Sequence, residues 1–105
     1  MSQIRYKLSF LPLFEEDLNE IVDYIREQLN NTTAAQNLVD DIESAINERL
    51  ETPLAFAPYP SSKKRTFPYY RINIRNYSVF YVVIEDIMEV RRVLYSGRDI
   101  ERLLV

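Results

Sequence analysis

The last third of this 105-residue sequence concentrates the side chains best suited to bind a partner or to catalyse a reaction. They are arginines and tyrosines from two alternating stretches and the segment that follows, namely Arg71, Arg75, Tyr77, Tyr81, Arg91, Arg92, Tyr95 and Arg98. An arginine fork pairs with phosphate or carboxylate, and a tyrosine ring stacks on a base or covers an apolar partner. A purely structural interpretation also fits, because tyrosines often pack at the rim of a core and strand arginines often protect a sheet edge.

The sequence lacks the residues of several familiar catalytic and cofactor sites. It has no cysteine, which excludes a thiol nucleophile and a thiolate metal site, and no histidine, which excludes an imidazole base and the usual zinc ligands. The single glycine, Gly97, cannot supply a glycine-rich phosphate loop. Neighbouring carboxylates such as Glu15 and Glu16 point apart on a helix, so we expect no metal and no cofactor.

Charge is distributed unevenly along the chain. The net formal charge is -3, yet residues 1–57 carry four Lys/Arg against eleven Asp/Glu, whereas residues 58–105 carry nine against five. A basic half attracts a polyanion or an acidic partner when its cations share one face, although solvated helix faces give a simpler explanation. No apolar run approaches the roughly 20 residues that cross a bilayer, and the first residues lack a signal-peptide core, so we expect a cytoplasmic protein with no membrane partner.

Hydrophobic spacing predicts a strand and then two helices in the first half. Residues 4–10 alternate, with Ile4, Tyr6, Leu8 and Phe10 on one side, as in a half-buried strand. From Pro12 to about Leu29 the apolar residues recur every three or four positions, which predicts an amphipathic helix. A second helix is expected to open with the capping box Thr33–Gln36 and to stop before Pro53, making an antiparallel helical hairpin.

The second half has the spacing of strands. After a proline-rich, basic loop over 53–68, residues 69–75 alternate, 77–84 are apolar as in a central strand covered on both faces, and 88–95 form a last strand. Residues 98–104 could add a short helical tail. We therefore predict one α+β domain over 1–105, in the order β-α-α-β-β-β, with the hairpin on one face of a small antiparallel sheet. The arginines and tyrosines of the closing strands should then gather on the opposite, bare face.

Two stretches resemble a known family. The segments Tyr70-Arg71-Ile-Asn-Ile-Arg-Asn76-Tyr77-Ser-Val-Phe-Tyr81 and Val93-Leu-Tyr-Ser-Gly-Arg98-Asp99 resemble the RelE/ParE bacterial toxins, which include plasmid stabilisation proteins, and the two predicted helices are similar to that family's helices. The resemblance runs nearly end to end. It implies the toxin of a type II toxin–antitoxin pair, held inactive by a cognate antitoxin whose C-terminal segment wraps the toxin surface. Acidic antitoxin segments would suit Arg71, Arg91 and Arg92. Whether the chain forms a homodimer stays open.

The resemblance implies one of two activities. RelE-like members cut messenger RNA on the translating ribosome without a metal, and ParE-like members poison DNA gyrase by binding. Arg71 and Arg98 match cations of the nuclease set, but Asn73 and Ser78 stand where that set has a lysine and an arginine, and the tail Leu103-Leu104-Val105 has no tyrosine. We therefore favour gyrase inhibition.

The candidate residues differ between these hypotheses. For gyrase inhibition the expected binding residues are the arginines Arg71, Arg75, Arg91, Arg92 and Arg98. The alternative is a metal-independent endoribonuclease in which Arg71 and Arg98 stabilise charge and Tyr77, Tyr81 or Tyr95 transfers a proton. Such a phenol would need a pKa far below its ordinary value of about 10. A further alternative is a non-toxic module that only binds antitoxin.

Overall fold

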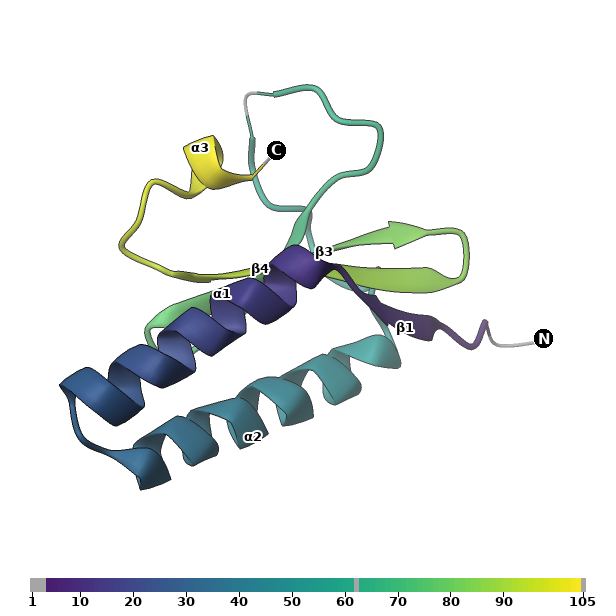
Figure 1. Cartoon of the computed structure of the whole chain (residues 1–105). Helices are drawn as coiled ribbons and strands as arrows, with labels where there is room; N and C mark the ends of the chain where they lie inside the picture. The colour runs from purple at the N-terminus through teal and green to yellow at the C-terminus, as the bar shows by residue number, and fades with distance from the viewer. Residues whose placement is uncertain (1–3, 62, 105) are drawn as a thin grey trace.

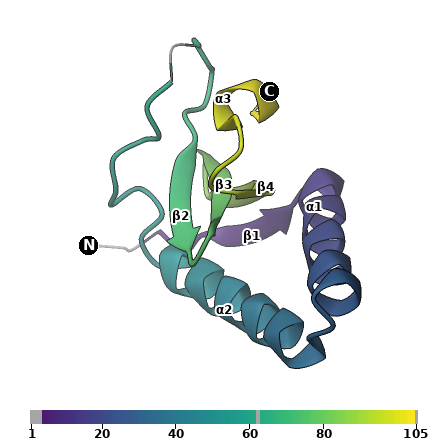
Figure 2. The same ribbon diagram turned by 90° about the vertical axis from the view of Figure 1, so that its left-hand side faces the viewer.

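The computed structural model describes residues 4–61 and 63–104, which form four strands and a helical hairpin followed by a short tail helix. The elements in chain order are β1 (Lys7–Phe10), α1 (Pro12–Asp23), the π-helical turn η1 (Tyr24–Gln28), α2 (Thr32–Leu50), β2 (Tyr70–Ile74), β3 (Tyr77–Ile84), β4 (Ile87–Tyr95) and α3 (Ile100–Leu103). The predicted α+β class and element order are confirmed. The helical hairpin lies on one side of the sheet and α3 on the other (Figures 1 and 2).

The hairpin begins and turns at residues with clear local reasons. α1 starts at Pro12, where the missing N–H costs nothing because first-turn N–H groups have no partner within the helix. The predicted capping box is wrong, because α2 starts one residue earlier and Asn31 caps it, its Oδ1 accepting from the Ala34 N–H at 2.9 Å. Gln36 donates instead to Asp40, one turn along the helix.

The sheet is mixed, with strand order β1-β4-β3-β2. β3 pairs antiparallel with β2 and with β4, as the short turns predicted. The prediction of a wholly antiparallel sheet is wrong for β1, which pairs parallel with β4 from Lys7–Ile87 to Phe10–Val90. The rule that short turns join antiparallel neighbours does not constrain β1, because the hairpin and a long loop separate it from the other strands.

The hairpin covers what we call the helix-side face of the sheet. Alternate residues of the strands point to it in cross-strand rows such as Ile72–Val79–Val93, because the side-chain period of a strand is two. They pack against the apolar stripes of the helices, where Phe14, Ile25, Ala35, Leu38, Ile42 and Ile46 are buried. This is the larger part of the core.

The opposite face, which we call the tail-side face, is not bare. The C-terminal segment and part of the 53–69 loop lie on it, so Phe80, Val82 and Leu94 pack against Ile100 and Leu104. The physical reason is that β3 is apolar on both sides, which the sequence did predict, and two apolar faces need two covers. Three cationic side chains hold the C-terminal segment on this face by donating hydrogen bonds to its backbone carbonyls: Lys63 to Glu101, Arg92 to Leu103 and Arg65 to Leu104.

Candidate functional site

One cross-strand row brings two of the predicted binding residues to the tail-side face. Arg71 of β2 lies opposite Phe80 of β3, which lies opposite Arg92 of β4. The two arginines are therefore the cross-strand neighbours of the same phenylalanine, one on each side. Their partners decide what each can do.

All three guanidinium nitrogens of Arg92 have hydrogen-bond partners within the protein. Its Nε and one terminal nitrogen donate to the two oxygens of Asp17 in α1, at 2.7 and 2.9 Å, and its other terminal nitrogen donates to the Leu103 carbonyl. Only 14% of the Arg92 side chain and 10% of that of Asp17 are exposed. The hydrogen bond to Asp17 is the main cause that raises the pKa of Arg92. Arg92 thus joins α1, the sheet and the tail, and little of it is left for a partner.

Arg91 and Arg75 also have acidic partners. A β-bulge falls at Arg91, since Phe80 pairs with Arg92 and Tyr81 pairs with Val90, and Arg91 Nε lies 2.8 Å from Glu89. Burial acts to lower the pKa of Arg91, but hydrogen bonds to Tyr69 and Glu89 raise it overall. Arg75 sits in the β2–β3 turn with φ of 54° and forms an exposed ion pair with Asp41 of α2. It therefore points toward the hairpin.

The predicted phenols are not on the tail-side face, so their predicted gathering there with the arginines is wrong. Tyr77, Tyr81 and Tyr95 share the strand parity of Ile72, Ile74 and Val93, which places all three on the helix-side face. Tyr77 and Tyr95 contact edge to face at 6.0 Å between ring centroids. Burial is the main cause that raises the pKa of Tyr77, and the neighbouring phenols Tyr24 and Tyr95 add to it.

Tyr81 is fully buried and its hydroxyl has two partners. It donates to the Pro53 carbonyl at 2.7 Å and accepts from Arg49 Nη1 at 2.9 Å. Burial raises the pKa of Tyr81, although the hydrogen bond from Arg49 opposes the shift. The phenol ties the end of the hairpin to the sheet, and its proton already has an acceptor.

Arg71 has a different setting from the other strand arginines. Its Nε donates to Ser78 Oγ at 2.8 Å, and its Cζ lies 5.6 Å from the Tyr59 ring centroid and 5.8 Å from that of Phe80. Ser78 is fully buried, and its hydroxyl also contacts Asn73 Oδ1 at 3.0 Å and Ser96 Oγ at 2.9 Å. Within the described part of the chain, neither terminal nitrogen of Arg71 forms an ion pair or a hydrogen bond.

The residues around Arg71 form what we call the Arg71 cradle, made of Tyr59, Asn73, Ser78, Phe80 and Ser96. The sequence prediction missed its polar members. Strand alternation already put Asn73 on the same side as Arg71, but placing Ser78 and Ser96 beside them needs the strand register. Arg98 follows in the turn after β4, exposed, and its side chain has no hydrogen bond or ion pair with the described residues.

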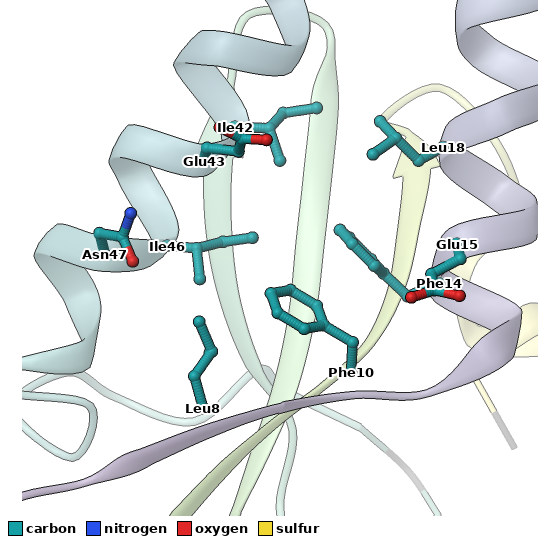
Figure 3. A pocket seen from close by; sticks show the side chains of 9 residues that line it. All are labelled: Leu8, Phe10, Phe14, Glu15, Leu18, Ile42, Glu43, Ile46 and Asn47. Carbon is teal, nitrogen blue, oxygen red and sulfur yellow. The ribbon is translucent and has the colours of Figure 1, made fainter.

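A second surface feature is an apolar groove of about 350 Å³ between α1, α2 and β1. Figure 3 shows the rings of Phe10 and Phe14 facing Ile42 and Ile46 across it, with Glu43 and Asn47 on the α2 side. The two rings contact each other at 5.3 Å, and Phe10 is 42% exposed. The lining is mainly apolar, and its charged members are the carboxylates of Glu15 and Glu43.

Residues 4–61 and 63–104 contain neither a cluster of metal ligands nor a membrane-spanning helix. They contain no group of three or more carboxylates placed to hold a metal ion. None of the helices described in this range is long and apolar enough to cross a membrane.

Comparison with known proteins identifies the family. Residues 8–100 match the family described as the ParE toxin of the type II toxin–antitoxin system parDE, so the chain belongs to the ParE toxin family. No curated protein matches the sequence.

Solved structures share the fold. The chromosomal ParDE system from P. aeruginosa matches with a TM-score of 0.72 at 18% identity, covering 90% of this chain and 98% of that one. The archaeal RelE–RelB complex from Pyrococcus horikoshii OT3 matches at 0.60 and 13%, with the same coverage. The E. coli DinJ–YafQ complex matches at 0.55 and 6%, covering 88% and 93%.

Proposed function

We propose that this toxin acts by binding, as an inhibitor of DNA gyrase, and not by cutting RNA. The observation that carries the proposal is the separation of the predicted phenols from Arg71, the arginine of the strands that has no ion pair with the described residues. Arg71 lies on the tail-side face, and Tyr77, Tyr81 and Tyr95 lie on the helix-side face. A cation and a proton-transfer group on opposite faces of a sheet cannot act on one phosphate.

The protonation of the phenols supports the same conclusion. Metal-free cleavage of RNA needs a base for the 2′-hydroxyl and an acid for the leaving oxygen. Burial raises the pKa of both Tyr77 and Tyr81, so at neutral pH a smaller fraction of each is in the phenolate form that could act as a base than for free tyrosine. An arginine cannot take the role, because its pKa lies above about 12. Asn73 and Ser78, which stand where the nuclease set has a lysine and an arginine, are uncharged.

One observation favours the nuclease alternative. The sequence prediction overlooked Tyr59, whose ring lies over the Arg71 guanidinium and meets Phe80 edge to face at 5.3 Å. It is a phenol on the tail-side face, next to Arg71. Tyr59→Phe therefore separates the hypotheses, since it abolishes cleavage by a nuclease that uses this hydroxyl and leaves gyrase inhibition nearly unchanged.

We further propose that an antitoxin is the natural partner of this chain. The similar solved structures include a ParDE system and RelE–RelB and DinJ–YafQ complexes, and the apolar groove offers an uncovered surface for a protein segment. Phe10→Glu places a charge at the groove without emptying the core, because the ring is partly exposed. We expect it to weaken binding of a cognate antitoxin by at least tenfold, with the fold unchanged by circular dichroism.

Purified protein tests the main proposal directly. We expect it to inhibit supercoiling by gyrase and to leave messenger RNA intact on translating ribosomes, as read by primer extension. Normal supercoiling at saturating toxin together with codon-internal cuts would establish the nuclease instead. Induced expression without growth arrest would leave only the non-toxic antitoxin-binding module.

A further inference from the structure

We propose that the Arg71 cradle is a preformed site for a single carboxylate of a protein partner, bound by both terminal nitrogens of Arg71. The inference rests on the proposed function, which makes the partner a protein, and it names the chemistry of one contact. Three features of the cradle support it.

The first feature is that the guanidinium is held in place before any partner arrives. Ser78 Oγ fixes Nε at 2.8 Å, and Ser78 is itself buried and bound to Asn73 and Ser96. The Tyr59 and Phe80 rings lie within 6 Å of the guanidinium carbon. Binding then costs little side-chain entropy, because the fork is already immobilised.

The second feature is that the charge of Arg71 is uncompensated. Arg75, Arg91 and Arg92 each form an ion pair, with Asp41, Glu89 and Asp17. The groups around Arg71 are hydroxyls, an amide and aromatic rings, which solvate a cation without neutralising it. The two terminal nitrogens keep the parallel donor pair that matches both oxygens of a carboxylate.

The third feature distinguishes a carboxylate from a nucleic-acid backbone. A phosphate backbone is gripped by several cations along a track, and affinity depends on how many phosphates are neutralised. Arg75, Arg91 and Arg92 are already paired with carboxylates, so Arg98 in the turn after β4 is the one other arginine of residues 70–98 that has no ion pair with the described residues, and the whole chain carries a net charge of -3. So few unpaired arginines suit one acidic side chain of a protein better than a track of phosphates.

The experiment uses the full chain and small anions as probes. The Nε–Hε signal of Arg71 in a 15N-labelled sample is followed by NMR during titration with acetate and, separately, with methyl phosphate. Arg26, an exposed arginine of η1, provides the internal reference. We expect the Arg71 signal to shift saturably with acetate, at a concentration at least fivefold below that needed for Arg26.

Two variants test the cause. Arg71→Lys keeps the charge and loses the fork. It also removes the Nε–Hε signal, so in this variant and in the parent the acetate response is compared at the backbone amides of Asn73 and Ser78, where we expect it to disappear in the variant. Ser78→Ala keeps Arg71 and removes its anchor, so the Nε–Hε signal should move toward that of a free arginine and acetate should bind at least threefold more weakly. Arg26→Gln is the control and should leave the Arg71 response unchanged. Backbone spectra show whether each variant is folded.

Several results would overturn the inference. An acetate response at Arg71 no stronger than at Arg26 would show that the fork is not a receptor. Saturation by methyl phosphate at tenfold lower concentration than acetate would assign the site to a phosphate group and overturn the assignment to a carboxylate. The anion titration does not involve gyrase, so its outcome is independent of whether gyrase is the target. If wild type and Arg71→Lys inhibit gyrase equally, the proposed function survives and the inference falls.

Discussion

Arg71 and Arg92 are cross-strand neighbours of the same residue, Phe80, on the same face of the sheet, and their side chains have opposite roles in the fold. Arg92 is bound by a buried carboxylate and a tail carbonyl, whereas Arg71 is bound by a serine and two rings. The difference shows that two cations equivalent in sequence pattern can be unequal as binding groups. An arginine whose charge is neutralised inside the chain contributes to stability, and one whose charge is left over can recognise a partner.

The largest expected effect is the loss of the buried partner of Arg92. Asp17→Ala leaves the Arg92 guanidinium without its carboxylate and the Val93 N–H without its acceptor. Removing one member of a buried ion pair costs about 3–5 kcal/mol, so we expect a loss of that size in the free energy of unfolding. Urea denaturation measures it. A loss below about 1 kcal/mol would mean that Arg92 is not a structural residue.

A smaller effect is expected from the buried phenol. Tyr81→Phe removes the hydrogen bonds to Arg49 and to the Pro53 carbonyl, and should cost about 2 kcal/mol at pH 7. Because burial raises the pKa of Tyr81 above that of the unfolded chain, its contribution is complete below about pH 10 and is lost as the pH rises through the folded pKa. Unfolding curves at pH 8 and pH 11 should therefore show a smaller difference between variant and parent at pH 11.

Arg71→Lys should change function more than stability. We expect at least tenfold weaker inhibition of gyrase, about 1.4 kcal/mol of binding, because lysine cannot make the paired contact. The free energy of unfolding should stay within about 1 kcal/mol of the parent, since no buried charge is left unpaired. Supercoiling assays and urea denaturation on the same preparations measure the inhibition and the free energy of unfolding. A loss of stability as large as that of Asp17→Ala would mean that Arg71 is as important for the fold as Arg92.

The smallest effect is expected at the exposed ion pair. The side chains of Arg75 and Asp41 are 52% and 47% exposed, and such pairs contribute less than about 1 kcal/mol. Asp41→Ala is therefore the control for Asp17→Ala, because both variants remove a helical aspartate from an ion pair with an arginine, of the β2–β3 turn in one case and of β4 in the other. Thermal unfolding should show almost no shift, and any shift should shrink further at high salt.

Much of the fold followed from local spacing. Alternation in 69–75 and the wholly apolar run in 77–84 predicted strands that the structure contains, and the coverage of β3 on both faces was expected from its composition. The direction of β1 and the capping role of Asn31 were missed, because each depends on contacts or backbone geometry that spacing does not encode.

The site was less predictable than the fold. Arg71 was selected correctly as a tail-side residue, but grouping it with Tyr77 and Tyr81 ignored the strand register, which puts residues of opposite parity on opposite faces. The pairing of Arg92 with Asp17 joins residues 75 positions apart, and nothing in either segment alone indicates it. Whether the five arginines bind a partner remains a prediction.

The contact between Asp17 and the Val93 backbone has a consequence for solubility. β1 ends at Phe10 opposite Val90, so the rest of β4 has β3 on one edge and no strand on the other. On that open edge the Asp17 carboxylate accepts the Val93 N–H at 3.2 Å in place of a strand carbonyl. Uncovered strand edges are templates on which other molecules assemble into aggregates. By accepting the Val93 N–H, a single helical side chain thus removes one backbone donor to which a strand of another molecule could pair.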